Sequence, residues 1–403
     1  MILKEKERVV INFLIIIQVI MKKIGILTLY KNNKNYGGIL QAYALQKFIH
    51  RIINDGEECI QISYIISPTP IKEKLRHSLE YRSFGENIKL GLKLLKKYFL
   101  KKKHITENQP IQRAFEDFED SIPHTQKTYT YETIYECAHQ FTHLIIGSDQ
   151  VWNGGIDLET FCLKFADDKV KRIAYAASSA STKFGKWQDL IFKENLGKFT
   201  AISVRERSVV PYFERMSGRK IAVVLDPVFL LSVQEWHHVS KKPDITFPYI
   251  FCYFLGENKT QCERAKRIAK VNNCKLVTIP NMNGFKESDI NFGDIQIENV
   301  GPREFLGLIE NARGVITDSF HATAFSIIFN KAFWALPRFQ NKKGENNNHR
   351  VIDILDQFSL SEYYSNFNDM LPQIRFDEAN MILKARVEES CIFLKDALGE
   401  KRC

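Results

Sequence analysis

The sequence lacks several features that mark well-known classes of protein. Its eight cysteines include no C-x-x-C pair and show no regular spacing, which argues against a zinc site or a disulfide framework. No G-x-G-x-x-G motif is present, so a dinucleotide-binding loop is not supported. We therefore expect a protein of the reducing cytoplasm, and no set of metal ligands or cofactor motif stands out.

No apolar run is long enough to cross a membrane. The run over residues 9–20 has only 12 residues, whereas a membrane helix needs about 20. No small-residue cleavage site follows it, and Met21, Lys22 and Lys23 lead directly into a predicted strand. We expect Met21 to be the natural start and residues 1–20 to be an upstream extension or a disordered tail, with a membrane anchor as the alternative.

The composition is that of a large folded protein with a basic balance. A chain of 403 residues with 44% hydrophobic residues is too long for one ordinary core and too apolar to be disordered, so two α/β domains are expected. The net charge of +10 indicates acidic partners, such as nucleic acid, anionic lipid or phosphorylated substrates. Charge alone does not separate these.

A lysine-rich stretch over residues 93–103 carries much of this positive charge. Six lysines alternate there with leucine, tyrosine and phenylalanine. One interpretation is a solvated helix face, and the other is a basic amphipathic face that rests on anionic lipid near a lipid-linked acceptor. We do not expect a nucleic-acid partner, because no recognised binding module surrounds the stretch.

Strand and helix patterns alternate along most of the chain. This alternation predicts α/β units with parallel sheets, divided into an N-terminal Rossmann-like domain over residues 21–226 and a C-terminal one over residues 227–376. A C-terminal helix within residues 377–403 is long enough to pack back across both. The predicted strands cover residues 24–30, 59–66, 143–146, 172–176, 201–204, 223–225, 249–255, 275–279 and 315–317, and the predicted helices cover residues 39–51, 259–271, 302–312, 351–358 and 377–398.

The region around His321 has the pattern of strand, polar turn and helix. Asp318 and Ser319 follow an apolar strand and can cap a helix that begins with Phe320. The free N–H groups at that helix start favour an anion, through hydrogen bonds and the helix dipole, and His321 lies beside them. The alternative is a capped core helix whose histidine is simply hydrogen-bonded.

Three other stretches place candidate groups at strand ends or helix starts. Asp149 and Trp152 follow a buried strand, where the carboxylate could accept a proton from a sugar hydroxyl and the indole could face a pyranose ring; an Asx-type turn with a core Trp is the alternative. Arg205 follows another strand and is suited to a carboxylate or phosphate, or to a structural ion pair with an acid. Gly37 and the next glycine open a helix, either beside a ligand or in a turn that merely packs.

Five motifs occur in order and together resemble the polysaccharide pyruvyl transferase family. They are Asn35-Tyr36-Gly37-Gly38 with the helix that follows, Gly147-Ser148-Asp149-Gln150-Val151-Trp152, Ser203-Val204-Arg205-Glu206, Asp226-Pro227 and Ser319-Phe320-His321. The resemblance implies a GT-B-like fold, with two Rossmann-like domains facing a central cleft. It also implies transfer of the enolpyruvyl unit of phosphoenolpyruvate onto two hydroxyls of one sugar, which forms a cyclic ketal without a nucleotide cofactor.

The resemblance also assigns roles to individual residues. His321 and Arg205, with Ser319 and Phe320, are implied on the donor side, with His321 binding the phosphate or acting as an acid. Asp149 is a candidate base on the acceptor side. The acceptor itself, a free or lipid-linked sugar, is expected near Asn35, Tyr36, Gly37 and Trp152.

One departure from the family pattern leaves other functions open. The family usually has Gly after the His of its last motif, whereas this chain has Ala322. A methyl group there could narrow the donor pocket, which would fit a catalytically silent binding protein of glycan assembly. A GT-B glycosyltransferase that uses a nucleotide sugar is the other alternative, because the fold pattern alone fits both enzymes.

Overall fold

The computed structural model describes residues 21–66, 109–153, 157–179, 181–280, 292–338, 348–365 and 368–401. The predictions on residues 1–20 and on the lysine-rich stretch 93–103 lie outside these residues. Within them, no helix combines the length and the apolar character needed to span a membrane.

The first half of the chain forms a parallel sheet of six strands in the order β2-β1-β3-β4-β5-β6. Ile24 on the inner strand β1 pairs with Cys59 on one side and with His143 on the other. The strands read as nearly continuous apolar runs because helices cover both faces of a parallel sheet. Their bounds are Lys23–Leu27 (β1), Glu58–Gln61 (β2), His143–Ile146 (β3), Lys171–Ala177 (β4), Ala201–Val204 (β5) and Ala222–Val223 (β6).

The described helices of this half lie between those strands along the chain. The principal one, α2, begins where the Asn35 side chain accepts hydrogen bonds from the N–H groups of Gly37 and Gly38. Among the described residues of this half, the helices are Tyr36–Ile52 (α2), Gln109–Asp120 (α5), Leu158–Phe161 (α6), Lys186–Asn195 (α7) and Val210–Ser217 (α8), with 3₁₀ turns at Ile134–Gln140 (η1), Leu196–Lys198 (η2) and Arg207–Val209 (η3).

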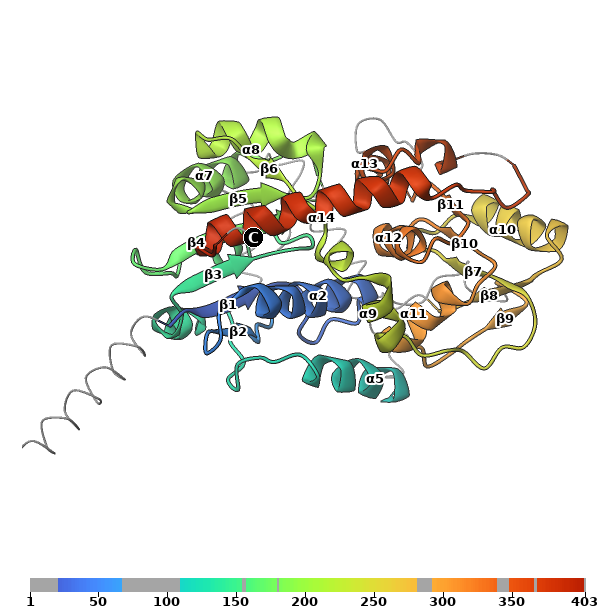
Figure 1. The fold of residues 1–403 in the computed structure, drawn as a ribbon, viewed down its shortest axis with the longest axis horizontal. Coiled ribbons are helices and arrows are strands. Elements are labelled where there is room, and N and C mark those ends of the chain that lie inside the picture. The colour runs from blue at the N-terminus through green and yellow to red at the C-terminus, as the bar shows by residue number, and fades with distance from the viewer. Residues whose placement is uncertain are drawn as a thin grey trace, which may run out of the picture.

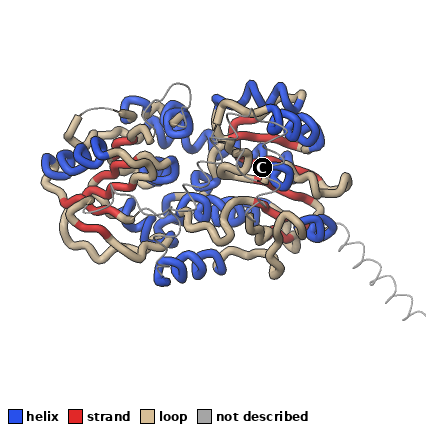
Figure 2. The backbone as a smooth tube through the Cα atoms, turned by 180° about the vertical axis from the view of Figure 1, so that it is seen from behind, coloured by secondary structure: helices blue, strands red, loops and turns tan. Residues whose placement is uncertain are grey.

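The second half forms a parallel sheet of five strands in the order β11-β10-β7-β8-β9. The strands are Tyr249–Tyr253 (β7), Lys275–Thr278 (β8), Ile295–Gln296 (β9), Gly314–Thr317 (β10) and Phe333–Ala335 (β11). The helices that the structure describes here are Val233–Val239 (α9), Lys259–Val271 (α10), Pro302–Glu310 (α11), Phe320–Ile328 (α12) and His349–Gln357 (α13), with 3₁₀ turns at Pro227–Leu230 (η4) and Ser361–Tyr363 (η6). Figure 2 shows the strands as two separate groups with helices around each.

The last helix, α14 (Asp377–Leu398), returns from the second half to the first (Figure 1). Its Ser390 hydroxyl accepts a hydrogen bond from the N–H of Leu225 at 3.0 Å. Its Arg386 donates from Nη2 to the Val223 carbonyl at 3.1 Å and to Oε1 of Gln357, in α13, at 3.0 Å. The predicted GT-B-like architecture, two Rossmann-like halves with a C-terminal helix packing back, is confirmed by this topology.

Side-chain contacts explain where element bounds differ from the prediction. Helix α2 begins at Tyr36 rather than at residue 39, because the Asn35 cap takes both glycines into the first turn. Strand β7 ends at Tyr253 rather than at residue 255, because the N–H groups of Leu255 and Gly256 donate to the Asp318 carboxylate instead of to a strand. The short strands β9 and β11 were not predicted from the sequence.

Candidate active site

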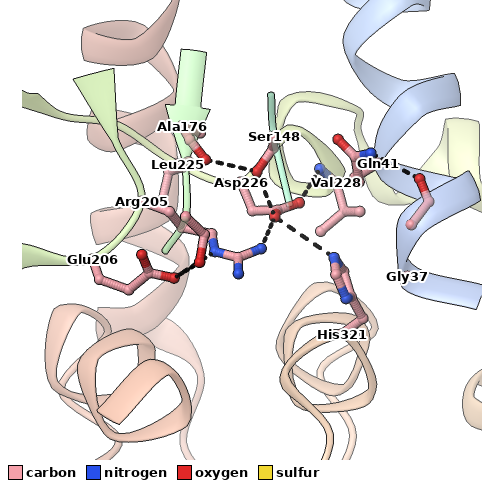
Figure 3. A network of polar contacts seen from close by, with 12 residues as sticks. Gly37, Gln41, Ser148, Ala176, Arg205, Glu206, Leu225, Asp226, Val228 and His321 are labelled. Carbon is pink, nitrogen blue, oxygen red and sulfur yellow. Dashed lines mark hydrogen bonds and ion pairs between the residues drawn. The ribbon is translucent and has the colours of Figure 1, made fainter. Parts of the chain in front are cut away.

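The polar network between the two halves is centred on Asp226, a fully buried residue between β6 and η4 (Figure 3). Its Oδ2 accepts from Nη1 of Arg205 at 2.6 Å, lies 3.2 Å from the Ser148 hydroxyl and lies 3.6 Å from Nε2 of His321. Its Oδ1 accepts from the N–H of Val228 at 3.1 Å. Burial alone would raise the pKa of Asp226, but His321 and Arg205 outweigh it and lower that pKa well below its usual range. The carboxylate is therefore ionised.

Arg205 lies just after β5 and is held on three sides. Nη1 pairs with Asp226, and Nε donates to Oε1 of Glu206 at 3.0 Å. The same Glu206 oxygen accepts from the Ser178 hydroxyl at 2.6 Å, and the guanidinium lies 4.0 Å from the centre of the Phe320 ring. Although burial opposes its charge, Glu206 and Asp226 raise the pKa of Arg205. Only Nη2, which is buried and has no partner, is left for a ligand.

His321, in the first turn of α12, is held between the two halves. Its Nε2 points to Asp226, as Figure 3 shows. Its other ring nitrogen, Nδ1, faces the start of α2, where a Cβ on Gly37 would come within 1.9 Å of it. The absence of a side chain at Gly37 therefore makes room for this imidazole, which explains one of the two glycines at the start of α2.

The start of α12 follows the predicted capping. Ser319 accepts at its hydroxyl from the N–H of Ala322 at 3.4 Å, so Ser319 supports the helix start directly. Asp318 accepts from the backbone of Leu255 and Gly256 and ties the turn to the end of β7. Ala322 is fully buried and belongs to the hydrophobic core. Its methyl group packs inward, which does not support the expectation that it narrows a donor pocket.

Asp149 lies in the turn that follows β3, opposite the start of α2. A Cβ on Gly38 would lie 3.4 Å from Oδ2 of Asp149, so the carboxylate is next to the first turn of that helix. The backbone of Asp149 has a φ of 60°, and its carbonyl accepts from the N–H of Ser178 at 3.0 Å. The structure thus brings Asp149 to the same side of the network as His321, as expected from the ends of parallel strands.

Arg350, in the first turn of α13, is a second guanidinium that sequence reasoning did not assign to the site. Burial and the neighbouring Arg205 lower its pKa to about 10. With its amide oxygen turned toward Arg350, Gln150 accepts from Nη1 at 2.6 Å and from Nη2 at 3.1 Å. The Nε of Arg350 is buried without a partner.

The network is not a set of free cations. Two guanidinium groups face three carboxylates, and most of the charge is already paired. The side chains are Arg205, Arg350, Asp149, Glu206 and Asp226. Several buried polar atoms nevertheless lack partners, and leaving each one unsatisfied costs about 1–3 kcal/mol. They are Nη2 of Arg205, Nε of Arg350 and Oε2 of Glu206. Such atoms are where a polar ligand would gain most.

The structure does not support two of the predicted acceptor contacts. Trp152 is fully buried and donates its indole N–H to the Phe161 carbonyl at 3.1 Å, so it offers no ring face to a sugar. Tyr36 is also buried, and its hydroxyl donates to the Val300 carbonyl at 2.9 Å, which joins α2 to the second half. Both aromatic rings are core residues for the same reason: other aromatic rings surround them. Asn35 is exposed at the start of α2.

Two parallel α/β halves with an imidazole, guanidinium groups and carboxylates gathered where they meet form an arrangement typical of enzymes that act on small charged molecules. A family model described as polysaccharide pyruvyl transferase matches residues 35–338, and the chain belongs to this family. The match confirms the resemblance seen in the motifs and makes the protein a transferase. No curated protein matches the chain.

Solved structures are similar to the chain over most of its length, at low identity. UDP-GlcNAc 2-epimerase from Methanocaldococcus jannaschii is 11% identical, with a TM-score of 0.49 and coverage of 91% of this chain and 92% of that one. The Neisseria meningitidis UDP-GlcNAc 2-epimerase, bound to UDP-GlcNAc, is 8% identical with a TM-score of 0.46, covering 94% and 99%. E. coli ADP-heptose lps heptosyltransferase II is 10% identical with a TM-score of 0.37, covering 91% and 99%. No functional conclusion follows from these similarities.

Proposed function

We propose that the protein is a pyruvyltransferase that moves the enolpyruvyl unit of phosphoenolpyruvate onto two hydroxyls of one sugar, in a surface polysaccharide or its lipid-linked precursor. The family match gives the class of enzyme. The observation that carries the proposal further is the position of His321, which is held between Asp226 and Gly37 where the two halves meet.

The donor carries a carboxylate and a phosphate, so its site must supply cations and N–H donors. We assign this role to His321, the N–H groups at the start of α12, and the unpartnered nitrogens of Arg205 and Arg350. Phe320 and Ser319 contribute indirectly, because the first lies against the Arg205 guanidinium and the second caps α12. This arrangement favours a small anion that bridges both halves.

The reaction is balanced without any further reagent. Carbon C3 of the donor gains a proton, C2 becomes electron-poor, and one sugar hydroxyl adds to C2 and loses its proton. The bond between C2 and the phosphate oxygen then breaks, and the second hydroxyl closes the ketal and loses its proton. Of the two hydroxyl protons, one replaces the proton given to C3 and the other leaves on the phosphate.

Asp149 is the proposed base that takes a proton from the acceptor hydroxyl. Its carboxylate lies beside the first turn of α2, so the sugar would approach near Asn35 and Gly37. Because Trp152 and Tyr36 are buried in the core, we leave both out of the proposed acceptor site.

A cytoplasmic protein could reach a lipid-linked acceptor through the lysine-rich stretch over residues 93–103. We propose this contact from the sequence alone. Flotation with anionic liposomes tests it: the wild-type protein should float, and a variant with these lysines changed to glutamate should remain in the lower fraction. Equal flotation of the two proteins would exclude the contact.

The test of function is phosphate release from phosphoenolpyruvate, measured with a panel of free and lipid-linked glycosides. His321→Ala should lower kcat/KM by at least about 10²-fold, the usual effect of losing a general acid. A loss below about threefold, in a folded variant, would remove His321 from the mechanism.

Thermal-shift titration separates the proposal from a nucleotide-sugar enzyme. At 100 times its Kd, phosphoenolpyruvate should stabilise the protein by about 2.7 kcal/mol, and a nucleoside diphosphate should have no effect. The reverse result would favour the glycosyltransferase.

A further inference from the structure

We propose that Asp226 is the positioning residue of His321: its Oδ2 faces Nε2 at 3.6 Å and favours the tautomer that carries a proton there, so that Nδ1 is the nitrogen that meets the ligand. Which ring nitrogen faces Asp226 and which meets the ligand is argued from the geometry alone. The identity of the ligand as phosphoenolpyruvate depends on the proposed function.

The surroundings of Asp226 determine which nitrogen carries the proton. Oδ2 is approached by Nη1 of Arg205 at 2.6 Å, by the Ser148 hydroxyl at 3.2 Å and by Nε2 of His321 at 3.6 Å. An ionised carboxylate can only accept hydrogen bonds. A bare Nε2 would therefore point its lone pair at a buried negative charge, whereas an Nε2–H group is attracted to it.

Neighbouring contacts fix the carboxylate itself. Oδ1 accepts from the backbone of Val228 at 3.1 Å, at the start of η4. The Ser148 hydroxyl has one proton and also lies 2.9 Å from the Ala176 carbonyl, so it can donate to either oxygen. Arg205 is anchored in turn by Glu206. Asp226 is thus held by Arg205 and Ser148 of the first half and by the N–H of Val228, two residues along the chain, while the histidine that it orients lies in α12.

One face of the imidazole is also restricted. A Cβ on Gly37 would lie 1.9 Å from Nδ1, 2.3 Å from Cγ and 2.5 Å from Cε1 of His321. The ring therefore lies flat against the first turn of α2 and cannot turn over without leaving Asp226. Nδ1 faces the same helix start to which Asp149 is adjacent.

In the proposed reaction, Nδ1–H is then the acid. The Nδ1–H bond breaks as the C3–H bond forms from the electron pair between C2 and C3 of the donor. The other ring proton remains on Nε2, facing Asp226, throughout. The carboxylate stabilises the charged imidazole before the transfer and keeps the neutral one in the correct tautomer afterwards. Nδ1 recovers its proton from one sugar hydroxyl, and the proton that Asp149 takes from the other leaves on the phosphate.

The direct test is a long-range ¹H–¹⁵N spectrum of the full chain labelled with ¹⁵N-histidine, at pH 8, with His321 assigned from the signals that His321→Gln removes. We expect a protonated Nε2. An Nε2 without a proton, with the proton on Nδ1, would overturn the proposal. This measurement needs neither activity nor ligand, so it can succeed even if the protein is not a pyruvyltransferase.

Variants then separate positioning from structural support. Asp226→Asn should lower kcat for phosphate release by about 10³-fold with a smaller change in KM, as expected when a general acid loses its orientation. Ser148→Ala, which removes a neighbour of the same oxygen but not of the imidazole, should keep the Nε2–H signal and lower kcat much less than Asp226→Asn does. If Ser148→Ala loses as much activity as Asp226→Asn while retaining Nε2–H, Asp226 does not act through His321. If wild-type Nε2 is protonated but phosphoenolpyruvate releases no phosphate, only the proposed function fails.

Discussion

Gly37→Ala offers a sharp test, because it adds one methyl group at a known distance from His321. The new Cβ would lie 1.9 Å from Nδ1 and 2.3 Å from Cγ of the imidazole, whereas an ordinary contact is about 3.5 Å. The ring or the helix must therefore move by roughly 1.5 Å. A displacement of about 1 Å at a reacting group can lower the rate about 10²-fold.

The cost in stability should be small by comparison. Overpacking costs about 1–3 kcal/mol, and Ala is preferred over Gly in a helix by about 1 kcal/mol, which offsets part of it. We expect a loss of about 1–2 kcal/mol in the free energy of unfolding, together with a loss of at least about 10²-fold in kcat. Urea unfolding and the phosphate-release assay measure the two.

The control for Gly37→Ala is Gly197→Ala in η2. A Cβ at Gly197 has no heavy atom within 4 Å, so this variant should keep both stability and activity. A folded Gly37→Ala protein with wild-type kcat would refute the reasoning, because it would show that the imidazole does not need its present position.

Three further predictions follow from buried groups. Ala322→Gly should cost about 1 kcal/mol in urea unfolding, as expected for Gly in a helix, but should leave kcat within about threefold, because the methyl group packs in the core. Trp152→Ala should lower the free energy of unfolding by about 3–5 kcal/mol, whereas Trp152→Phe should leave the KM for the acceptor unchanged. Burial lowers the pKa of His143 to about 4. Between pH 6.5 and pH 4 the unfolded chain therefore binds a proton that the folded one excludes. The free energy of unfolding should decrease by up to about 3 kcal/mol as the pH is lowered through this range. In urea unfolding at pH 7.5 and pH 5, His143→Gln should lose less stability than the wild type; an equal loss would contradict this account.

Local sequence patterns predicted the fold where a single element determines its own bounds. The predicted strands over residues 143–146 and 201–204 and the predicted helices over residues 259–271 and 377–398 have the bounds found in the structure. Each is a periodic or apolar run between polar residues, which is the information that a sequence carries locally. A two-residue strand such as β9 carries too little of it, and the strand predicted over residues 223–225 shares only Val223 with β6.

The site could be predicted only in part, because its contacts are distant along the chain. Asp226 was recognised as part of a motif but not as a site residue, since Ser148 and His321 are far from it in sequence. Whether Trp152 faces a sugar or lies in the core could not be predicted for the same reason. Its core partners Phe192, Phe199 and Phe213 follow many residues later, and no local pattern separates a core indole from one that faces a sugar.

The position of Asp226 in the chain makes the site a property of both halves together. Asp226 follows the last strand of the first sheet and begins the turn η4, which leads into the second half. Its partners Arg205 and Ser148 belong to the first half, and His321 belongs to the second. Removing one partner from a buried ion pair costs about 3–5 kcal/mol, because the remaining charge stays buried. The second half alone would therefore keep His321 but lose Arg205 and Ser148, which hold the Asp226 carboxylate in place. Neither half can assemble this site on its own.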